Sequence, residues 1–562
     1  GSYTVTYTVS DAAGNAASEV SRIVNVVDTT APVITLIGDA IVTAEAGSDY
    51  IDAGATAIDS YEGSLAPVVN STVDTNVLGS YTVTYTVSDA AGNAASEVSR
   101  IVNVESIFHV SNTTELRAAL DTAATNGFDD TIILADGVYK TTDDGHGALT
   151  YQSNEDNKLT LKGSSPENVI LSGDNSHQIL IHSSTKDAPL LLEKLSFRDG
   201  FSEDYYSSIV EADYTIDVAD CHFIDNKSST DILNVFANAL ISNSRFENNK
   251  MGFGSALYIR AIDYSKSKIT NSIFIQNTYD IDAIDINVGG AAVNIYQGSI
   301  DVSSSLFDGN SSERSGGAIY SYYADIKITD STFINNTSKE DYFNRNIDGG
   351  GAIYGLKVDV FNSVFESNVS SRCGGAIYSR SDVRIENSIF ANNSADEEGR
   401  AVSEDTFING CSGGGVWASG SVISLNSLYT ANSSAISIPF SENSIILNNV
   451  FRENTNYDIG SIPAFEGGHG GTGAVETLSN NYIDESRLTI IYFSYNNVFG
   501  GINLGFVDEA NGDYRLTIDS GLIDIGTTGI EGVNFPETDL DGKARISGGA
   551  IDIGPYEHQY SN

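Results

Sequence analysis

The sequence is poor in sulfur and in positive charge. Its 562 residues include 3 cysteines, 1 methionine and 8 prolines, and 29 Lys plus Arg stand against 75 Asp plus Glu. Three cysteines without metal-ligand spacing are too few to staple a fold, so a disulfide scaffold and redox chemistry are disfavoured. Cys373 and Cys411 stand at different offsets from their neighbouring Gly-Gly pairs, which should turn their side chains apart. We therefore expect these two and Cys221 to be free thiols that pack as small apolar groups.

The formal net charge of −46 argues against nucleic acid and anionic membrane surfaces as partners. The sequence also lacks a signal peptide and any apolar run long enough to span a membrane. We expect no membrane insertion by this segment, and export and anchoring signals must lie outside it. Such an acidic excess usually makes a solvated surface, although carboxylates are also the oxygen ligands that Ca²⁺ prefers.

An exact internal repeat organises the beginning of the chain. Residues 1–26 recur without a change at 79–104. In both copies an alternating strand, YTVTYTVS, is followed by the turn DAAGN and a second strand, SEVSRIVNV, which predicts a β-hairpin. With the strands before it, residues 27–104 form a complete immunoglobulin-like β-sandwich. Residues 1–26 are then the closing hairpin of an incomplete repeat, which the next domain, another chain or a longer stalk would complete.

The DTTAP entry at Asp28 and the DAAGN hairpin at Asp89 resemble the bacterial immunoglobulin-like repeats of surface adhesins. In such a sandwich the incoming linker and two of its turns share one pole. This topology brings Asp28, Asp59 and Asp89 together, and we predict that they bind Ca²⁺. The resemblance implies the same, because these motifs carry calcium-associated acids in similar repeats. The alternative is that Asp59 and Asp89 only cap their turns through local hydrogen bonds.

From residue 105 the pattern changes and begins with the segment NTTELRAALDTA. The spacing of Asn112 and Glu115 resembles a capping box and predicts that one amphipathic helix starts here. Strand-like segments follow at once. A solenoid needs a cap over its first coil, so we interpret this helix as that cap.

A ladder of Phe-x-x-Asn motifs then predicts a right-handed parallel β-helix over residues 105–562. Each motif follows a short β-prone stretch such as KITNSIF. Stacked coils would place each Phe above the next inside the cylinder, while Asn tolerates left-handed turns and its amide can bond along the ladder. The motifs are Phe223/Asn226, Phe246/Asn249, Phe274/Asn277, Phe307/Asn310, Phe333/Asn336, Phe365/Asn368, Phe390/Asn393, Tyr429/Asn432 and Phe451/Asn454. The predicted fold class is all-β, with this helix preceded by immunoglobulin-like repeats.

Paired glycines recur between these motifs and predict tight corners. They open the segments GGAAV at Gly289, GGAIY at Gly316, Gly350 and Gly374, and GGGVW at Gly413. In GGAIY, Ile and Tyr must face opposite sides of the strand. An outward Tyr row would favour glycan binding, whereas an outward Ile row would favour protein contact or a covering loop.

Two resemblances accompany these patterns. The GGAIY and Phe-x-x-Asn motifs together resemble the polymorphic outer-membrane protein repeats of bacterial adhesins and autotransporters, over roughly residues 220–455. The segment from FVDEANGDYRL to DIGPYE resembles the closing module of choice-of-anchor Q surface proteins. Both imply an extracellular protein at the bacterial cell surface.

We favour a noncatalytic adhesin or structural surface protein. Its partner would be a cell-surface glycan or protein, or a second copy bound through the immunoglobulin-like repeats. One alternative is a self-assembling extracellular filament, and the other is a secreted polysaccharide lyase. The latter is suggested by the opening HVSNTTELRAALDTA, which resembles chondroitinase-B-like and alginate-lyase-like β-helices.

The residues that a lyase would need do not cluster in the sequence. A lyase needs a carboxylate neutraliser and a base beside it. The basic residues are scattered over different coils, and we interpret the histidines as surface or turn residues, so we assign no catalytic and no cofactor-binding residue. The residues considered are Arg198, Lys250, Arg314, Lys327, Arg372, His177, His182 and His222.

Overall fold

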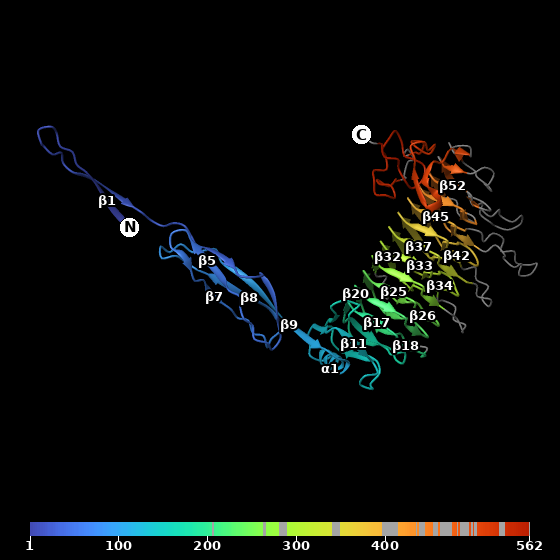
Figure 1. Cartoon of the computed structure of the whole chain (residues 1–562), viewed down its shortest axis with the longest axis horizontal. Coiled ribbons are helices and arrows are strands. Elements are labelled where there is room, and N and C mark those ends of the chain that lie inside the picture. Colours follow the sequence, from blue (N-terminus) through green and yellow to red (C-terminus); the bar gives the residue numbers. More distant parts are fainter. Residues whose placement is uncertain are drawn as a thin grey trace, which may run out of the picture. The chain divides into compact units, whose positions relative to one another are not determined.

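The computed structural model describes residues 1–204, 207–261, 266–279, 289–339, 349–395, 414–433, 435–437, 444–452, 454, 459–460, 475–479, 481–483, 494–495, 498–499, 503–527 and 534–560. The chain forms two compact units (Figure 1). The first is Gly1–Phe108 with Phe128–Thr131, and the second is His109–Gly127 with Ile132–Asn562. The first unit holds the repeated hairpins and the second holds a parallel β-helix.

The complete immunoglobulin-like domain is a sandwich of two sheets. Strict alternation in YTVTYTV places Val83 and Tyr85 in the core between them, both fully buried. One sheet consists of β3 (Val33–Leu36), β5 (Ala55–Asp59) and β6 (Gly63–Leu65). The other consists of β7 (Val68–Asn70), β8 (Gly79–Thr86), β9 (Val98–Val110) and β4 (Ile41–Glu45), where β4 pairs parallel with β9.

A buried arginine crosses this core, which the sequence patterns did not predict. Arg100 is 1% exposed, and its guanidinium forms an ion pair with Asp52 and donates to the Asp39 carbonyl at 2.9 Å. The Tyr85 hydroxyl donates to the same carboxylate at 2.6 Å. Burial raises the pKa of Tyr85 to about 12, and the hydrogen bond to Asp52 acts in the same direction. Because each charged group has partners, the alternating strand tolerates a cation on its inner face.

Residues 1–26 form the predicted hairpin from β1 (Ser2–Tyr7) and β2 (Val20–Asn25), with Ser2 opposite Asn25. The same residues that are buried in 79–104 are exposed here. Tyr7 is 53% exposed, whereas its repeat, Tyr85, is fully buried. Local sequence therefore sets the hairpin in both copies, while burial depends on the sheet that packs against it.

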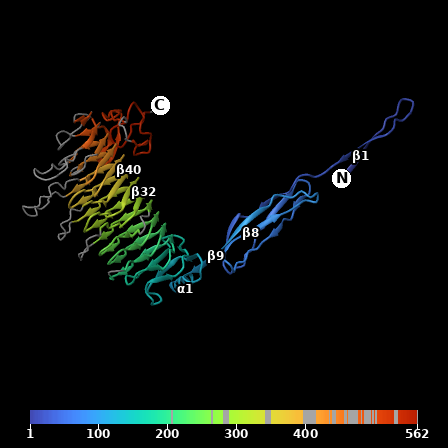
Figure 2. The same cartoon turned by 180° about the vertical axis from the view of Figure 1, so that it is seen from behind.

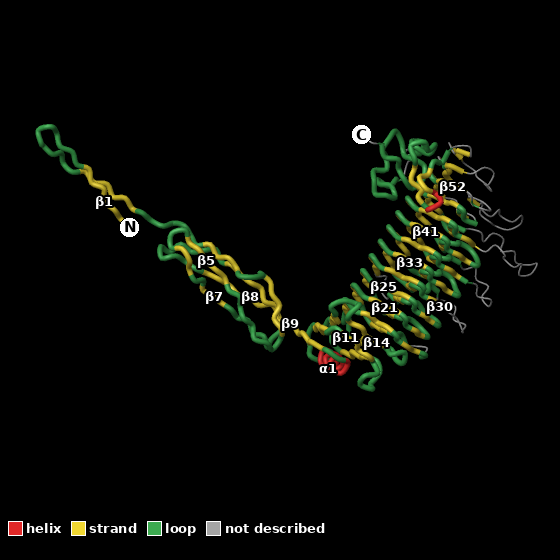
Figure 3. The backbone as a smooth tube through the Cα atoms, in the orientation of Figure 1, coloured by secondary structure: helices red, strands yellow, loops and turns green. Residues whose placement is uncertain are grey.

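The predicted capping helix is confirmed as α1 (Thr113–Ala123), which contacts β12 (Leu149–Ser153) of the first coils (Figure 3). The Asn112 side chain accepts a hydrogen bond from the Glu115 amide at 3.0 Å. The Glu115 carboxylate in turn accepts from the amide of Ser111, the residue before the N-cap, at 2.8 Å, so the helix start is a variant of the capping box.

The β-helix confirms the predicted all-β fold class. Each complete coil crosses four parallel sheets in the same order, which we name sheets 1 to 4, and neighbouring coils stack in register (Figure 2). In sheet 1, for example, Ile300 of β32 lies beside Ile326 of β36. Inward residues of successive coils thus form rows of like side chains, which is the basis of the repeated motifs.

The strands of the four sheets have the following bounds. Sheet 1 consists of β10 (Asp130–Leu134), β13 (Leu159–Lys162), β16 (Leu190–Glu193), β20 (Ile216–Ala219), β24 (Ala239–Ser242), β28 (Lys266–Thr270), β32 (Ser299–Ser303), β36 (Asp325–Thr329), β40 (Lys357–Phe361), β44 (Val383–Glu386), β48 (Val422–Leu425), β51 (Ser444–Leu447), β54 (Val475–Ser479) and β56 (Ser494–Tyr495). Sheet 2 consists of β11 (Gly137–Lys140), β14 (Val169–Ser172), β17 (Ser196–Arg198), β21 (His222–Ile224), β25 (Arg245–Glu247), β29 (Ile273–Ile275), β33 (Leu306–Asp308), β37 (Thr332–Ile334), β41 (Val364–Glu366), β45 (Ile389–Ala391), β49 (Leu428–Thr430), β52 (Val450–Arg452), β55 (Tyr482–Ile483) and β57 (Val498–Phe499).

The remaining two sheets are shorter. Sheet 3 consists of β18 (Phe201–Ser202), β22 (Lys227–Ser228), β26 (Lys250–Met251), β30 (Thr278–Tyr279), β34 (Ser311–Ser312), β38 (Thr337–Ser338), β42 (Val369–Ser370) and β46 (Ser394–Ala395). Sheet 4 begins with β12 and continues with β15 (Leu180–Ser184), β19 (Val210–Ala212), β23 (Leu233–Val235), β27 (Leu257–Ile259), β31 (Val293–Ile295), β35 (Ile319–Ser321), β39 (Ile353–Gly355), β43 (Ile377–Ser379), β47 (Val416–Ala418), β50 (Ile436–Ser437) and β53 (Ile459–Gly460).

The aromatic residues of the Phe-x-x-Asn motifs form one continuous stack inside the helix, as predicted. The stack runs from Phe197 to Phe451, with neighbouring ring centroids 4.6 to 5.1 Å apart. Phe197 extends the predicted ladder by one coil. Its motif was missed because Gly200 stands where Asn is found in the other coils.

The asparagines form an unbroken hydrogen-bonded ladder. Asn277, for example, donates from Nδ2 to Asn310 Oδ1 at 2.9 Å and to the Phe246 carbonyl at 3.0 Å. The expected left-handed backbone lies one residue earlier, at exposed corner residues such as Gln276 (φ 53°) and Asn335 (φ 56°). The corner residue thus absorbs the backbone bend, which leaves the ladder asparagine free to point inward.

The glycine corners are confirmed, and the outward residue is tyrosine. Gly316 has φ 68°, and a Cβ on Gly317 would lie 2.1 Å from the next coil's backbone. The Ile row of GGAIY is fully buried inside the helix, so the Tyr row lies on the outer side of sheet 4. Its rings stack on one another from Tyr320 to Trp417 and are only 1 to 7% exposed. Because these rings stack on one another and are at most 7% exposed, this row offers no open ring face to a sugar.

The expectation of three free thiols is wrong for Cys373, which is disulfide-bonded. The prediction assumed that side chains alternate along an extended chain, but Gly374 next to it has φ 64° and breaks that alternation. Cys221 is free and buried, and burial raises the pKa of its thiol to about 12. Cys411 and Gly413 lie outside the described residues.

The C-terminal segment packs against the outer face of sheet 2. Leu516, Leu522 and Ile553 form one apolar cluster with side chains of the last coils, including Leu428 and Val450. The segment contains β58 (Phe506–Asp508), the 3-10 helix η1 (Glu509–Asn511) and β59 (Asp513–Leu516). The module thus covers one flank of these coils.

His182 is buried, so its interpretation as a surface or turn residue is wrong. It belongs to an inward row of sheet 4 and is fully buried, because its ring stacks on Tyr151 at 4.9 Å. Neither ring nitrogen has a hydrogen-bond partner. Burial lowers the pKa of His182 to about 4.

We predict that this histidine makes the β-helix sensitive to acid. Its folded pKa lies below its usual value, so protons bind preferentially to the unfolded chain. Its contribution to stability is therefore complete above about pH 6.5 and is lost as the pH falls toward 4, by up to ~3 kcal/mol. Urea unfolding at pH 7 and pH 4.5 measures the free energy of unfolding at each pH. Between these two values, His182→Phe should lose less of this free energy than the unchanged chain. His146→Phe, at an exposed histidine, is the control, and equal losses in both variants would contradict the prediction.

Candidate metal site

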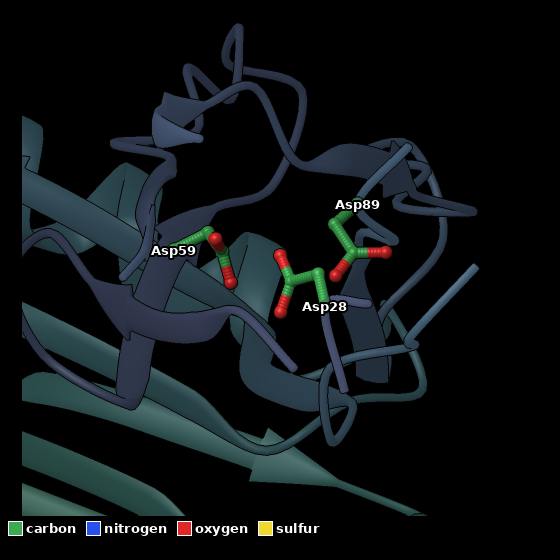
Figure 4. A group of neighbouring side chains, drawn as sticks. All are labelled: Asp28, Asp59 and Asp89. Atoms are coloured by element: carbon green, nitrogen blue, oxygen red, sulfur yellow. The ribbon is translucent and has the colours of Figure 1, made fainter. Parts of the chain in front are cut away.

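Three carboxylates meet at one pole of the immunoglobulin-like domain (Figure 4). Asp28 lies in the linker before β3, Asp59 ends β5, and Asp89 lies in the turn after β8. One carboxylate oxygen from each residue lies within 4.8 Å of those from the other two. The structure therefore brings together the three residues that the sequence selected for a calcium site.

Each carboxylate also caps its own loop. The Asp59 Oδ1 atom accepts from the Tyr61 amide at 2.7 Å, and Asp89 Oδ1 accepts from the Asn93 amide at 2.7 Å. Asp28 Oδ1 accepts from the Thr30 amide at 3.0 Å. These bonds do not satisfy the whole cluster, because the Oδ2 atoms of Asp28 and Asp59 are buried without a hydrogen-bond partner. Capping thus accounts for one oxygen of Asp28 and of Asp59 and leaves the other available.

The cluster concentrates negative charge with little access to water. Asp59 is 2% exposed and Asp89 7% exposed. Burial favours the neutral acid at Asp89, but the hydrogen bonds from Asn93 prevail and lower the pKa of this residue. Within the described ranges, no Lys, Arg or His forms an ion pair with any of the three acids. A bound cation would offset their repulsion.

The donor set fits calcium. Ca²⁺ takes oxygen ligands at 2.3–2.6 Å, so two oxygens on one ion cannot be more than about 5 Å apart. The observed limit of 4.8 Å meets this condition. The cluster contains neither Cys nor His, whose sulfur and nitrogen atoms dominate zinc sites. Asp28, Asp59 and Asp89 would hold the ion, which would tie the linker to two turns of the sandwich.

Two neighbouring residues support the cluster and were missed by the sequence reading. Glu62 accepts a hydrogen bond from the Ala90 amide at 2.9 Å and so connects the Asp59 turn with the Asp89 turn. The Asn93 side chain donates to Asp89 at 2.7 Å and to the Asp28 carbonyl at 3.2 Å. The place of Asn93 in the DAAGN turn could have predicted its contact with Asp89. The contact of Glu62 could not be predicted, because it depends on the packing of loops that are distant in the sequence.

The first hairpin provides an internal comparison. Asp11, the repeat of Asp89, accepts hydrogen bonds from Asn15 in the same arrangement, and these bonds lower its pKa. Residues 1–26 contain no counterparts of Asp28 and Asp59. The DAAGN turn therefore forms through its own hydrogen bonds, without the other two acids.

The basic residues considered for lyase chemistry are distributed over several faces of the β-helix. Arg198 lies on sheet 2, Lys250 on sheet 3 and Lys327 on sheet 1. Arg314 and Arg372 follow strands of sheet 3. These five residues therefore do not converge on one position that could neutralise a uronate and hold a base beside it.

Family comparisons identify modules of bacterial surface proteins. Residues 34–104 match the bacterial surface protein Ig-like domain. Residues 304–322, 330–356 and 362–380 match the Chlamydia polymorphic membrane protein repeat. The chain therefore combines a bacterial surface immunoglobulin-like domain with polymorphic membrane protein repeats on a parallel β-helix, as its motifs predicted. The resemblance of its C-terminal segment to choice-of-anchor Q modules stays a prediction.

Solved structures provide partial overlaps. The PL6 family alginate lyase AlyGC is 15% identical at a TM-score of 0.42, over 77% of this chain and 60% of that one. The PL6 family polysaccharide lyase Pedsa3628 from Pseudopedobacter saltans is 13% identical at a TM-score of 0.37, over 72% of this chain and 94% of that one. A GH87 α-1,3-glucanase catalytic unit from Streptomyces thermodiastaticus is 13% identical at a TM-score of 0.26, over 69% of this chain and 66% of that one. At these values the overlaps support no conclusion about activity.

No curated protein matches the sequence. Among the described residues, no helix is both long and apolar enough to cross a membrane.

Proposed function

We propose that this chain is a noncatalytic adhesin of the bacterial cell surface, in which the β-helix contacts a glycan or protein partner. The observation that carries the proposal is the combination of a surface immunoglobulin-like domain with polymorphic membrane protein repeats in one chain. The dispersed basic residues favour this function over a lyase.

We further propose that Asp28, Asp59 and Asp89 bind one Ca²⁺ ion. Their mutual distances, their burial and the partnerless oxygens of Asp28 and Asp59 support this assignment. The ion would fix the linker that enters the sandwich, because one of its ligands precedes the first strand and the other two belong to turns. Calcium has a structural role in this proposal and takes no part in a reaction.

Adhesion is tested with beads that carry the full chain. Coated beads should be retained on bacterial cells or on their extracellular matrix several-fold more than beads coated with serum albumin. Equal retention would contradict the adhesin function. Ultraviolet absorbance from unsaturated products on a panel of uronate polymers tests the lyase alternative, and robust turnover would replace the proposal. Light scattering of the chain in solution tests filament formation.

A further inference from the structure

We propose that the outer edge of sheet 4, where it turns toward sheet 1, binds an acidic polysaccharide. Tyr296 and Tyr323 would provide ring surfaces, while Arg260 and Arg380 would pair with the anionic groups. We name these four residues the tyrosine-arginine patch. The inference rests on the adhesin function proposed above and names its ligand class and its site.

The register of sheet 4 places these residues together. Tyr258, Asn294 and Tyr320 are neighbours in three successive coils. Two positions later in the same coils come Arg260, Tyr296 and Tyr322, each directly after its strand. The patch therefore follows the helix axis, along which an extended polymer can lie.

Arg380 reaches the patch from a coil further along. Its guanidinium carbon lies 4.0 Å from the centre of the Tyr322 ring, and its Nη1 donates to the Tyr322 carbonyl at 3.2 Å. Tyr323 is 49% exposed. It makes perpendicular contacts with Tyr322 at 4.5 Å and with Tyr296 at 5.6 Å.

This arrangement differs from the buried aromatic row beside it. From Tyr320 to Trp417 the rings lie face to face and cover one another. The perpendicular contacts of Tyr323 hold its ring in place while nearly half of its surface remains open. A rigid, exposed aromatic ring with a polar tip suits the mixed apolar and hydroxyl surface of a pyranose.

The charge of the patch selects an acidic sugar. Arg260 is exposed and Arg380 half-buried, and neither forms an ion pair with the described residues, although acids outnumber bases 75 to 29 in the chain. Guanidinium groups match carboxylate and sulfate oxygens in a planar, bidentate way. At physiological salt, fields are screened within about 8 Å, so the distant acids of the chain act only weakly on a ligand at these two cations.

Partnerless polar atoms on the adjoining row support a hydroxyl-rich ligand. Asn294 is 2% exposed, and its Nδ2 atom has no hydrogen-bond partner. Asn234 Oδ1, two coils earlier in the same row, also lacks one. A buried donor and acceptor without partners are costly unless a ligand or water completes them. A polysaccharide supplies both kinds of group.

Affinity measurements on the full chain test the patch. Polygalacturonate carries carboxylates, dextran sulfate carries sulfates and dextran carries neither. We expect binding to at least one acidic polymer and none to dextran, and the stronger of the two identifies the anionic group. Tyr323→Ala and Arg260→Ala should each weaken that binding about tenfold, the loss of ~1.4 kcal/mol that is common for a central aromatic or arginine contact. Tyr61→Ala and Arg22→Ala, at exposed sites of the first unit, should bind like the unchanged chain.

Three outcomes would overturn the proposal. The first is that the chain binds neither acidic polymer, and the second is that it binds dextran as strongly as the acidic polymers. The third is that Tyr323→Ala and Arg260→Ala bind the acidic polymer as strongly as the unchanged chain. If beads still adhere to cells in any of these cases, the adhesin function stands and its partner is a different molecule, such as a protein. If the beads do not adhere at all while the polymers bind, the patch stands and the adhesin function fails.

Discussion

Removal of calcium is expected to destabilise the immunoglobulin-like domain strongly. With free Ca²⁺ a thousandfold above its dissociation constant, binding contributes about 4 kcal/mol to the folded state. For a domain of this size, that loss lowers the melting temperature by roughly 20 °C. Differential scanning calorimetry of the full chain, in calcium and in EGTA, should show one transition that shifts and one that does not. A calorimetric trace indifferent to EGTA would remove the metal site.

The repeated hairpin provides a matched control for this experiment. Asp89→Asn removes a ligand from the three-acid cluster, whereas Asp11→Asn makes the same change in an identical loop that has no other acids around it. We expect Asp89→Asn to abolish the calcium-dependent shift. Asp11→Asn should leave it intact, because Asp11 only caps its turn. Equal responses of the two variants would show that the turn, and not the cluster, determines the effect.

Interruption of the asparagine ladder is expected to destabilise the β-helix by about 4 kcal/mol or more. Asn336→Ala removes the acceptor of Asn310 and the donor to Asn368 and to the Phe307 carbonyl, all of them buried. Each buried polar group left without a partner costs about 1–3 kcal/mol. The unfolding midpoint in urea, followed by tyrosine fluorescence, measures the loss.

Asn335→Gly is the matched control, because it changes the neighbouring residue at the same corner. Asn335 is exposed and has φ 56°, a conformation that glycine adopts without strain. The control should stay within about 1 kcal/mol of the unchanged chain, since it loses one exposed hydrogen bond to Asp308 and some rigidity. Similar midpoints for Asn336→Ala and Asn335→Gly would mean that the ladder adds little to stability.

The aromatic stack and the asparagine ladder share a physical origin in repetition, whereas the three-acid cluster depends on topology. A solenoid stacks the same position of successive coils, so one favourable side chain is selected again in every coil. The stack from Phe197 to Phe451 and the asparagine ladder both arise in this way. The acids of the sandwich meet because the linker and two turns of a known topology share a pole.

The sequence by itself determined the features that depend on periodicity and local backbone chemistry. Alternation in YTVTYTV predicts the hairpin, Asn112 and Glu115 predict the helix start, and the Phe-x-x-Asn spacing predicts the coils. Each of these signals lies within one turn, one strand or one repeat. The expected topology of the sandwich was then enough to group Asp28, Asp59 and Asp89. The distances between their carboxylate oxygens came only from the structure.

Burial between distant segments was decided only by the tertiary structure. From the sequence, His182 is expected at the surface, the Tyr row of GGAIY could face either side, and no pattern indicates that Arg100 is buried. The reason is that a residue's neighbours in a solenoid or sandwich come from other coils and strands. The contact of Arg380 with Tyr322 joins residues that no local pattern relates. Side-chain type and spacing fix which face a residue occupies, but what covers that face depends on the whole chain, since burial is a property of the packed fold.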